Sequence, residues 1–460
     1  MTATLRALNG FGLGARVGEP KRIRDPKAWL RAQLDEGAPV VSPPAEAAPA
    51  RVADALRAFR MVGQAGGNER QQARRRLVEI AAAESHAALT ERVRTDRPFV
   101  ERLVAFWSNH LCVSAAARTI VAPLAGSYER EAIRPHVLGR FEDMVLASAK
   151  HPAMLLYLDN FQSIGPKSRA AELSARGRGQ RRGLNENYAR ELLELHTLGV
   201  DGGYAQQDVQ ELARVLTGWT IGGFSAAGGR RLRAPQNDAS GPIGFAFQPL
   251  LHEPGAKTIL GVRYDEAGVG EGERAVRALC RHQATATFVA GKLVRHFVSD
   301  EPPATAVGRL ARVFRETGGD LRAVSTALID LPEAWSATAR KFRTPQDWLV
   351  AALRACHVDD VPEQTLPVLR QLRHPLWAPQ APKGFGDTTQ EWADPDSLLN
   401  RAELSRTIAR RLNERIDPRT LLEVIDVGAD DPLRRLLADT SVPADERIAL
   451  ALAGPAFQWR

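Results

Sequence analysis

The feature that most constrains the fold is a helical spacing of apolar residues that recurs along most of the chain. From about residue 50 onward, segment after segment has apolar residues three and four positions apart, with Arg and Glu between them. Examples are "RVADALRAFRMVG" and "ERQQARRRLVEIAAAESHAALTERV". This spacing is typical of amphipathic helices, whereas half-buried strands alternate. Strand signals are almost absent, so we predict an all-α fold, built as one large irregular multi-helix domain.

Length, composition and proline content indicate how the chain is organised. The 460 residues are 44% hydrophobic and 25% charged, which is ordinary for a soluble globular protein. No window approaches 18 apolar residues, so the sequence predicts no membrane span. The stretch "EGAPVVSPPAEAAPA" is too rich in Pro for a core element. We predict an N-terminal segment with one short helix and a Pro/Ala linker (1–49), a main helical domain (50–415) and a C-terminal helical extension packed on it (416–460).

Two long loops interrupt the helical pattern. Residues 221–265 are rich in Gly and Pro and contain short β-prone pieces such as "GFAFQ" and "TILGV". They predict an irregular excursion with at most a small β-hairpin. The second loop, "HPLWAPQAPKGFGDTTQEW", carries Trp377 and Trp392. Exposed aromatic residues in Pro-rich loops suit interfaces, so one interpretation is that the second loop docks another protein.

The charge of the chain is compatible with anionic partners but does not require them. The formal net charge of +8 comes from Arg spread along the chain, a composition that a GC-rich genome also produces. The basic segment "SRAAELSARGRGQRRG" has no aromatic residues for base stacking, which argues against nucleic-acid binding. The N-terminus lacks the continuous apolar stretch and cleavage site of a signal peptide, so cytoplasm is the default location.

Cysteine usage and motif content narrow the chemistry. The three cysteines, Cys112, Cys280 and Cys356, cannot form a disulfide framework and lack metal-finger spacing. Each lies in an apolar helical run, so we predict that they are small core residues. The sequence contains no P-loop, GxGxxG, GxSxG or CxxC motif. This counts against an obvious NTPase, dehydrogenase or esterase and leaves any cofactor unknown.

One helical segment, "GLNENYARELLELHTLGVDGG", places a charge where an apolar residue is expected. At about 100° per residue, four residues share one apolar arc: Leu184, Tyr188, Leu192 and Leu195. Glu191 falls inside this arc, flanked by Asn187 and Glu194, while Thr197 lies opposite and Gly199 ends the helix. A carboxylate on a packed face is costly unless it is paired, hydrogen-bonded or protonated. We therefore expect a cationic or hydrogen-bond-donating group to contact Glu191.

Two other segments offer partners for that carboxylate. In "VAFWSNHLCV", His110 falls between apolar positions and is expected to point inward. In "ATFVAGKLVRHFVS", Lys292, Arg295 and His296 share one edge of an otherwise apolar helix. These groups either form an internal network that stabilises helix packing, or line a pocket where perturbed pKa values suit proton transfer or anion binding. The sequence leaves both interpretations open.

The pocket interpretation assigns roles to individual residues. The candidate catalytic residues are Glu191, Glu194 and His110, with a glutamate as general acid or base. The candidate ligand-binding residues are Asn109, Asn187, His252, Lys257, Lys292 and Arg295. The loop "LHEPGAKTILG", which contains His252 and Lys257, would form a lid. We predict no metal site, because the spacing is not HExxH and the five positions from Glu191 to His196 do not share a helix face.

Several blocks of the sequence carry a family likeness. In order they are "FWSNHLCVS", "HPAMLLYLDNFQS", "GLNENYARELLELHTLGVDGGYAQQDVQELARVLTGWT", "HEPGAKTILG", "ATATFVAGKLVRHFVSDEPP" and "LWAPQAPKGFGDTTQEW". They closely resemble blocks of the bacterial "domain of unknown function 1800" family, from about residue 5 almost to the C-terminus. The resemblance implies a mostly helical fold and brings no established activity with it.

The resemblance also implies a partner. Genes of this family commonly neighbour those of the "domain of unknown function 1501" family, whose fold resembles the alkaline phosphatase and sulfatase group and which often bears a twin-arginine export signal. The favoured expectation is therefore a binding and assembly partner of such a phosphatase/sulfatase-like protein, and co-export with it is compatible with this expectation. The alternative is an enzyme whose Glu/His/Lys/Arg-lined cleft acts on an anionic or carbohydrate-like substrate by general acid/base chemistry.

Overall fold

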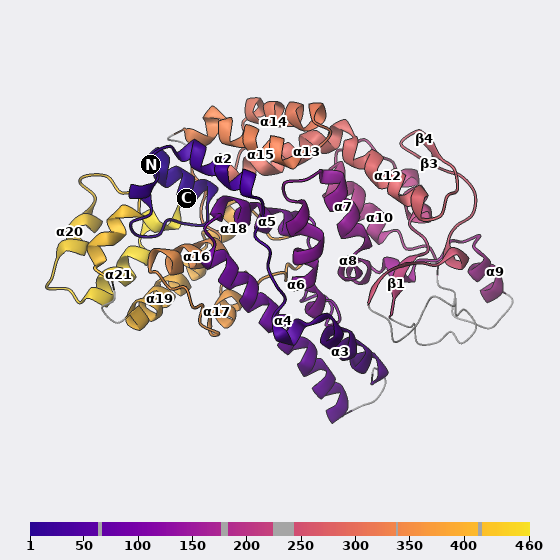
Figure 1. Cartoon of the computed structure of the whole chain (residues 1–460), viewed down its shortest axis with the longest axis horizontal. Helices are drawn as coiled ribbons and strands as arrows, with labels where there is room; N and C mark the ends of the chain where they lie inside the picture. The colour runs from indigo at the N-terminus through magenta and orange to yellow at the C-terminus, as the bar shows by residue number, and fades with distance from the viewer. Residues whose placement is uncertain (63–66, 176–182, 224–242, 337–338, 413–415) are drawn as a thin grey trace.

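The structure is a computed structural model that describes residues 1–62, 67–175, 183–223, 243–336, 339–412 and 416–460. Helices dominate it, as the apolar spacing predicts, and the fold is all-α (Figure 1). The N-terminal part forms α1 (Ala3–Leu5), η1 (Arg6–Phe11), η2 (Pro20–Arg22), α2 (Pro26–Glu36), η3 (Ala45–Ala47), α3 (Pro49–Met61), α4 (Asn68–Arg94), α5 (Pro98–His110), η4 (Ala122–Leu124), α6 (Ala125–Tyr128), η5 (Glu129–Ile133) and η6 (Arg134–His136).

The middle of the chain contains all the strands of the described residues. Its elements are α7 (Phe141–Lys150), α8 (Pro152–Tyr157), η7 (Asn160–Gln162), α9 (Arg169–Ala175), α10 (Asn187–Glu191), η8 (Leu192–Thr197), α11 (Gln206–Val215), β1 (Trp219–Gly222), β2 (Gly244–Phe247), η9 (Pro249–Leu251), β3 (Lys257–Ile259), β4 (Val262–Tyr264), α12 (Val269–Arg281) and α13 (Gln283–Phe297). The strands form two short antiparallel pairs, β1–β2 and β3–β4, where the sequence predicted at most one hairpin. Residues 224–242 of the predicted excursion lie outside the described residues, as do 176–182 of the basic segment.

The C-terminal part completes the helical body. It contains α14 (Ala304–Glu316), α15 (Leu321–Asp330), η10 (Pro332–Trp335), α16 (Pro345–Ala355), α17 (Thr365–Gln371), α18 (Thr389–Trp392), α19 (Pro395–Leu412), η11 (Pro418–Glu423), α20 (Pro432–Ala438), α21 (Ala444–Ala453) and η12 (Pro455–Gln458). In Figure 1, α13, α14 and α15 lie along the top, α19 to α21 lie at the left, and α3 with the lower half of α4 projects below the body. The helices of the described chain include none that is long and apolar enough to cross a membrane.

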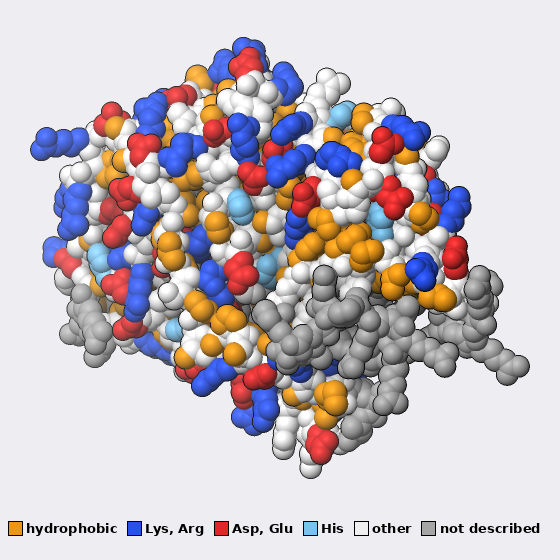
Figure 2. Space-filling model, turned by 45° about the vertical axis from the view of Figure 1, so that its right-hand side comes forward, with side chains coloured by type: hydrophobic (Ala, Val, Ile, Leu, Met, Phe, Trp, Pro, Cys, Tyr) orange, Lys and Arg blue, Asp and Glu red, His pale blue; other side chains and the backbone are white. Residues whose placement is uncertain are grey.

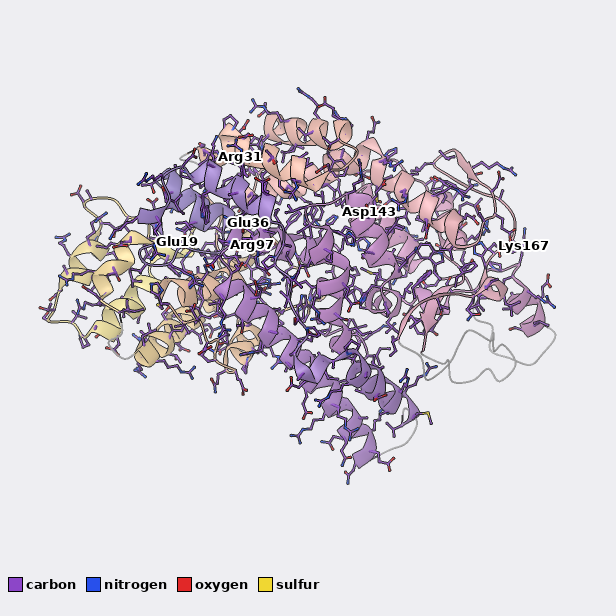
Figure 3. The ribbon with its side chains drawn as sticks, in the orientation of Figure 1. Glu19, Arg31, Glu36, Arg97, Asp143 and Lys167 are labelled. Atoms are coloured by element: carbon purple, nitrogen blue, oxygen red, sulfur yellow. The ribbon has the colours of Figure 1, made fainter. Side chains whose placement is uncertain are left out.

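Local sequence explains where the helices near the centre begin. Proline occupies the first turn of α2, α5 and α16, where the missing N–H costs nothing. Asp25 accepts the backbone N–H groups of Lys27 and Ala28 at the start of α2, and Thr344 accepts that of Asp347 at the start of α16. Arg97, just before α5, lies beside Glu36 at the end of α2, with 3.6 Å between Nε and Oε2 (Figure 3).

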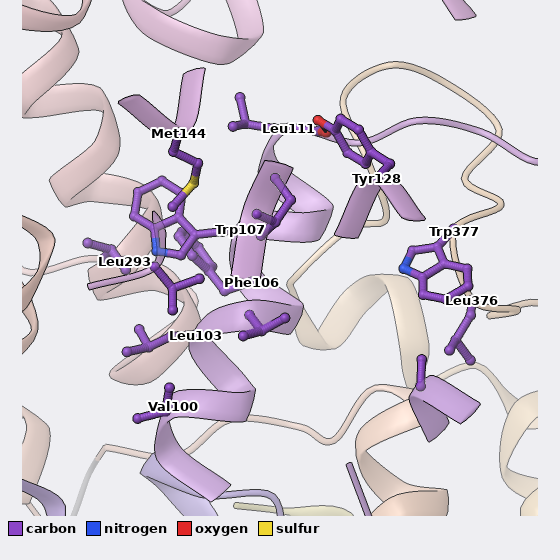
Figure 4. Close-up of a cluster of buried hydrophobic side chains, with 14 of the residues drawn as sticks. Val100, Leu103, Phe106, Trp107, Leu111, Tyr128, Met144, Leu293, Leu376 and Trp377 are labelled. Atoms are coloured by element: carbon purple, nitrogen blue, oxygen red, sulfur yellow. Dashed lines mark hydrogen bonds between the residues drawn. The ribbon is translucent and has the colours of Figure 1, made fainter. Parts of the chain in front are cut away.

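Helix α5 lies at the centre of the core. Phe99, Leu103 and Trp107 on this helix are at most 1% exposed. Trp107 lies between Met144 of α7 and Leu293 of α13 (Figure 4). A helix that is buried around most of its circumference positions its polar side chains precisely, because every neighbour is packed. Polar residues at the C-terminal end of α5 are therefore well placed to form a defined site.

Several buried glutamates inside the body are paired with arginines. Glu101 of α5 accepts two hydrogen bonds from Arg134, at 2.6 and 2.7 Å, although the glutamate is fully buried. Glu129 accepts from Arg92 at 3.0 Å. Buried carboxylates are tolerated only with such partners. On the surface, the face in Figure 2 shows basic and acidic side chains interspersed over the described residues.

The two ends of the described chain lie together (Figure 1). The backbones of Lys341 and Arg460 exchange hydrogen bonds of 3.0 and 2.9 Å, and the Arg460 guanidinium donates to the carbonyl of Gly10 at 3.1 Å. One core cluster runs from Leu5 to Phe457. The N- and C-terminal segments are therefore built into the same core as the central helices.

Candidate functional site

A cavity of about 430 Å³ opens between α5, α13, the start of α16 and residues 374–391; we call it the α5–α13 cleft. Of the candidate residues named from the sequence, it brings together Asn109, His110, Lys292 and Arg295. Cavities of this size hold small molecules. The charges in its wall decide which kind of molecule it can accept.

Three cations of the cleft wall have no carboxylate partner within the described residues: Lys292 and Arg295 on α13, and the exposed Lys383. The Lys292 ammonium makes no hydrogen bond or ion pair there, and its nearest ring contact is Phe288, 5.6 Å from Nζ to the ring centroid. Burial lowers the pKa of Lys292 to about 8. Arg295 donates from Nε to the Asp300 carbonyl at 3.4 Å and is otherwise exposed. Lys292 and Arg295 can therefore both contact a ligand.

A histidine–aspartate pair lies on the same wall. His296 Nδ1 is 2.8 Å from Asp387 Oδ2. Burial lowers the pKa of His296, although Asp387 opposes the shift. Burial alone would raise the pKa of Asp387, but His296 and Lys341 outweigh it and hold that pKa at about 2. At neutral pH the imidazole is therefore uncharged, donates from Nδ1 to the carboxylate, and keeps a lone pair on Nε2, which has no partner among the described residues.

Asp347 at the start of α16 is fully occupied. Arg102 of α5 contacts both of its oxygens at 3.1 Å, and Arg460 Nε lies 3.1 Å from Oδ2. Burial favours the neutral acid, but the two guanidinium groups lower the pKa of Asp347 well below its usual range. This ion cluster stabilises the wall, and because both carboxylate oxygens contact arginines, Asp347 has none free to pair with Lys292 or Arg295.

Residues 374–391 form one side of the cleft and contact the body through Asn109. The Asn109 amide donates to the Phe385 carbonyl at 2.9 Å and accepts the Phe385 N–H at 2.8 Å. Gly384 has φ +80°, and a Cβ there would lie 2.5 Å from the Asn109 carbonyl oxygen. Asn109 thus shapes the cleft wall, while its own amide is satisfied by the protein.

The aromatic residues of this segment are buried, which corrects the prediction of an exposed docking loop. Trp377 is 9% and Trp392 7% exposed. Trp377 Nε1 donates to Glu129 at 2.7 Å, and Trp392 Nε1 donates to the Gly386 carbonyl at 3.0 Å. Trp377 also has φ +47°, a conformation that is strained for a bulky side chain. Apolar burial and these hydrogen bonds keep the tryptophans inside, so they are not available to a partner.

His110 lies in the cleft wall, 2% exposed. Its Nε2 is 3.1 Å from the His196 carbonyl oxygen, and its Nδ1 has no partner in the described chain. Burial, with Lys292 and His196 as further causes, lowers the pKa of His110 well below the usual range. The imidazole is therefore neutral, with Nε2 donating and a lone pair on Nδ1.

The expectation that Glu191 meets a cation is wrong. Glu191 is half-buried and makes no hydrogen bond or ion pair with any residue that the structure describes, His110 and Arg295 included. Burial, with Glu194 as a second cause, raises its pKa, while Arg190 acts in the opposite direction. Glu194 itself pairs with Arg190 at 3.5 Å. Neither glutamate, therefore, belongs to the α5–α13 cleft.

Two departures from a single regular helix explain this error. Leu184, where the predicted helix starts, precedes α10, and the π-helical η8 begins at Leu192, so a rotation of 100° per residue holds only from Asn187 to Glu191. Thr197, expected to face outward, is fully buried, and Leu195 is only half-buried. Asn187 is exposed at the start of the helix. Gly199, with φ +85°, ends the segment as predicted.

His252 and Lys257 form a separate buried cluster and not a lid. His252 Nε2 and Lys257 Nζ lie 3.2 and 3.1 Å from the carboxylate of Glu271, which is fully buried. Lys257 also donates to the Glu253 carbonyl at 2.6 Å, and His252 Nδ1 lies 2.8 Å from the Thr217 carbonyl. This cluster joins the end of α11, β3 and the first turn of α12. Its charges are paired within the protein, so it resembles the structural network that the sequence left as one interpretation.

The described residues contain neither a metal-ion site nor a reactive cysteine. They contain no group of three His, Cys, Asp or Glu side chains that could hold a metal ion. Cys112, Cys280 and Cys356 are buried thiols, as predicted. Cys112 lines the cleft, but burial raises its pKa to about 12, so it is protonated at neutral pH.

The site geometry can now be set beside the family comparison. The family model described as "Protein of unknown function (DUF1800)" matches residues 6–459. The chain belongs to this family. No curated protein and no solved structure matches the chain. For this DUF1800 chain, the residues around the cleft are therefore the basis for any functional proposal.

Proposed function

We propose that the α5–α13 cleft binds a small anionic molecule, and that Lys292 and Arg295 contact its negative charge. The observation that carries this proposal is the pairing of charges in the wall. Asp347 and Asp387 are each engaged by cations or imidazole, whereas Lys292 and Arg295 have no carboxylate partner among the described residues. A ligand carboxylate, phosphate or sulfate would supply that partner.

The energetics favour binding at Lys292. An ammonium that is partly removed from water and has no counter-charge is costly, and the same burial lowers the pKa of Lys292. An anion bound beside it would offset the desolvation and return the pKa toward its usual range. The cleft is also large enough for a ligand with a polar body, such as a sugar carrying the anionic group.

The His296–Asp387 pair supports the enzymatic alternative. A neutral imidazole that is oriented by a carboxylate is a common general base. His296 also lies on the same helix, α13, as Lys292 and Arg295, which have no carboxylate partner among the described residues. In this proposal His296 takes the acid/base role that the sequence assigned to Glu191, while Lys292 and Arg295 orient the anionic substrate. His296 Nε2 is covered by protein, so a side-chain movement must precede any proton transfer through it.

The partnership with a phosphatase/sulfatase-like protein remains a proposal that depends on the family resemblance. An anion-binding cleft is compatible with it, because phosphatases and sulfatases release or consume anionic esters. The buried Trp377 and Trp392 give it no docking surface. Co-purification of the two proteins, with exchange of the 374–391 segment as control, tests it separately.

Calorimetric titration with inorganic phosphate, sulfate and glucose 6-phosphate tests the anion site. Lys292→Ala and Arg295→Ala should each weaken binding about tenfold or more, since each removes a charge-assisted contact. Arg410, an exposed arginine of α19 outside the cleft, gives the matched control, and Arg410→Ala should change the affinity by less than about twofold. Equal affinity in all these variants would refute the site.

A further inference from the structure

We propose that Lys292 acts as an amine nucleophile and forms an imine with an anionic aldehyde or ketone bound in the α5–α13 cleft. This inference depends on the proposed anion site and deepens it, since it names the reactive group that the ligand carries. The ligand class is a small molecule with a carbonyl group and a carboxylate or phosphate.

The position of Lys292 on α13 supports this role. Phe288 precedes it by one turn and His296 follows by one turn, so all three share a face of the helix. The Phe288 ring lies 5.6 Å from Lys292 Nζ and 6.1 Å from the His110 ring, between centroids. The amine thus lies next to an apolar ring, and no carboxylate of the described residues neutralises it. Catalytic imine-forming lysines are activated by this kind of desolvation.

The protonation state agrees with the geometry. An ordinary lysine is almost entirely ammonium at neutral pH and therefore a poor nucleophile. The pKa of Lys292, lowered to about 8 by burial, leaves a substantial neutral fraction at pH 7.5 to 8. Lys257 and Lys341, which are 2% exposed, differ from the half-buried Lys292, because they pair with Glu271 and with Asp300.

His110 supplies a hydrogen-bond acceptor in the same cleft. Its Nε2–H donates to the His196 carbonyl, which leaves the Nδ1 lone pair without a partner in the described chain. Lys292 is near enough to be the second cause, after burial, of the lowered pKa of His110, so the imidazole stays neutral beside the amine. His110 can therefore accept a hydrogen bond from the Lys292 amine and orient it for attack.

The reaction balances without an oxidant or reductant. The neutral amine of Lys292 attacks the carbonyl carbon, a C–N bond forms as the C=O π bond opens, and one N–H proton passes to the carbonyl oxygen to give a carbinolamine. Loss of that oxygen as water, with loss of the remaining N–H proton, gives the imine. Arg295, one turn along the helix and without a carboxylate partner, contacts the anionic group of the same molecule.

Trapping with pyridoxal 5′-phosphate, which carries both an aldehyde and a phosphate, tests the inference on the full chain. After incubation at pH 8 and reduction with sodium borohydride, peptide mass spectrometry should show Lys292 modified at least about tenfold faster than Lys21, whose side chain is 73% exposed. Inorganic phosphate should slow the modification of Lys292 and not that of Lys21. Lys292→Arg should abolish labelling of that peptide, and His110→Asn should slow it.

The outcomes separate the two proposals. If phosphate binds with dependence on Lys292, but Lys292 is labelled no faster than Lys21, the imine is refuted and the anion site stands. If labelling of Lys292 is fast but phosphate neither binds nor protects, the amine is reactive without an anion site and the inference as stated is wrong. Fast labelling, protection by phosphate and slowing by His110→Asn together support it.

Discussion

Asp347 Oδ2 lies 3.1 Å from Arg460 Nε, so the last residue of the chain contacts the first turn of α16 inside the body. Arg102 of α5 contacts the same carboxylate. Arg102 and Arg460 are 2% and 1% exposed, so one acidic group contacts two buried cations. This arrangement supports the wall of the cleft from behind.

Replacing this carboxylate should be severe. Asp347→Asn leaves two buried guanidinium groups without their counter-charge, and we expect a loss of about 3–5 kcal/mol in the free energy of unfolding. Urea denaturation monitored by circular dichroism measures it. Asp359→Asn, which removes an exposed partner of Arg16, is the matched control and should cost less than about 1 kcal/mol. A similar small loss in both variants would show that the buried cluster adds little.

Glu191→Gln should behave in the opposite way. The carboxylate has no cationic partner in the described chain and lies near Glu194, so its removal should leave stability unchanged or raise it by a few tenths of a kcal/mol. Glu101→Gln, at a buried glutamate that binds Arg134 through both oxygens, should instead be strongly destabilising. Melting temperatures of the two variants test this comparison. A large loss of stability in Glu191→Gln would contradict the prediction, because it would mean that a partner stabilises the carboxylate.

Mild acid should destabilise the protein through its buried histidines. Burial lowers the pKa of His196 and His374 to about 3 each, against about 6.5 in an unfolded chain. As pH falls below 6.5 the unfolded state takes up protons that the folded state does not, so stability is lost at about 1.4 kcal/mol per pH unit for each such histidine. Denaturation curves from pH 7 to pH 5 measure the slope. His374→Gln should reduce it, and a slope that stays the same would contradict the assignment.

Anion affinity should fall on the alkaline side. Lys292 carries its charge below its pKa of about 8 and loses it above, so phosphate binding should weaken between pH 7 and pH 9. Lys292→Arg retains the charge throughout this range and should flatten the profile. Titrations at three pH values for each protein suffice. A profile that is equally steep in both would assign the effect to another group.

Gly384 provides a test of the cleft wall. Gly384→Ala introduces a Cβ 2.5 Å from the Asn109 carbonyl at a left-handed backbone position, and we expect a cost of about 1–3 kcal/mol and weaker phosphate binding. Gly428→Ala is the control, because a Cβ there meets nothing within 4 Å. If both variants bind phosphate like the parent, the contact between Asn109 and residues 384–385 does not shape the site.

The sequence predicted the helical fold because helical periodicity is a local property. It also predicted that His110 points inward and that Lys292, Arg295 and His296 share a helix face, since α5 and α13 are regular helices. The prediction for Glu191 relied on a regular rotation that ends where η8 begins. The mixed polar sequence of this segment did not predict a π-helix.

Other parts of the site could not be predicted from spacing. His296 and Asp387 are 91 positions apart, and only the tertiary fold brings them within 2.8 Å. The Trp residues of the 374–391 segment illustrate a second difficulty. Pro-rich sequence predicts a loop but not its burial, which depends on acceptors elsewhere, such as Glu129 for Trp377.

The contacts of Arg460 with distant parts of the chain have a consequence for folding. The hydrogen bond between Gly10 and Arg460 joins positions 450 residues apart, and Arg460 also donates to the carbonyl of His296. Contacts between positions so distant in sequence form after the local helices, because the chain must lose conformational entropy before they stabilise the fold. The wall of the α5–α13 cleft, where Arg102 and Arg460 both contact Asp347, should therefore become ordered late during refolding.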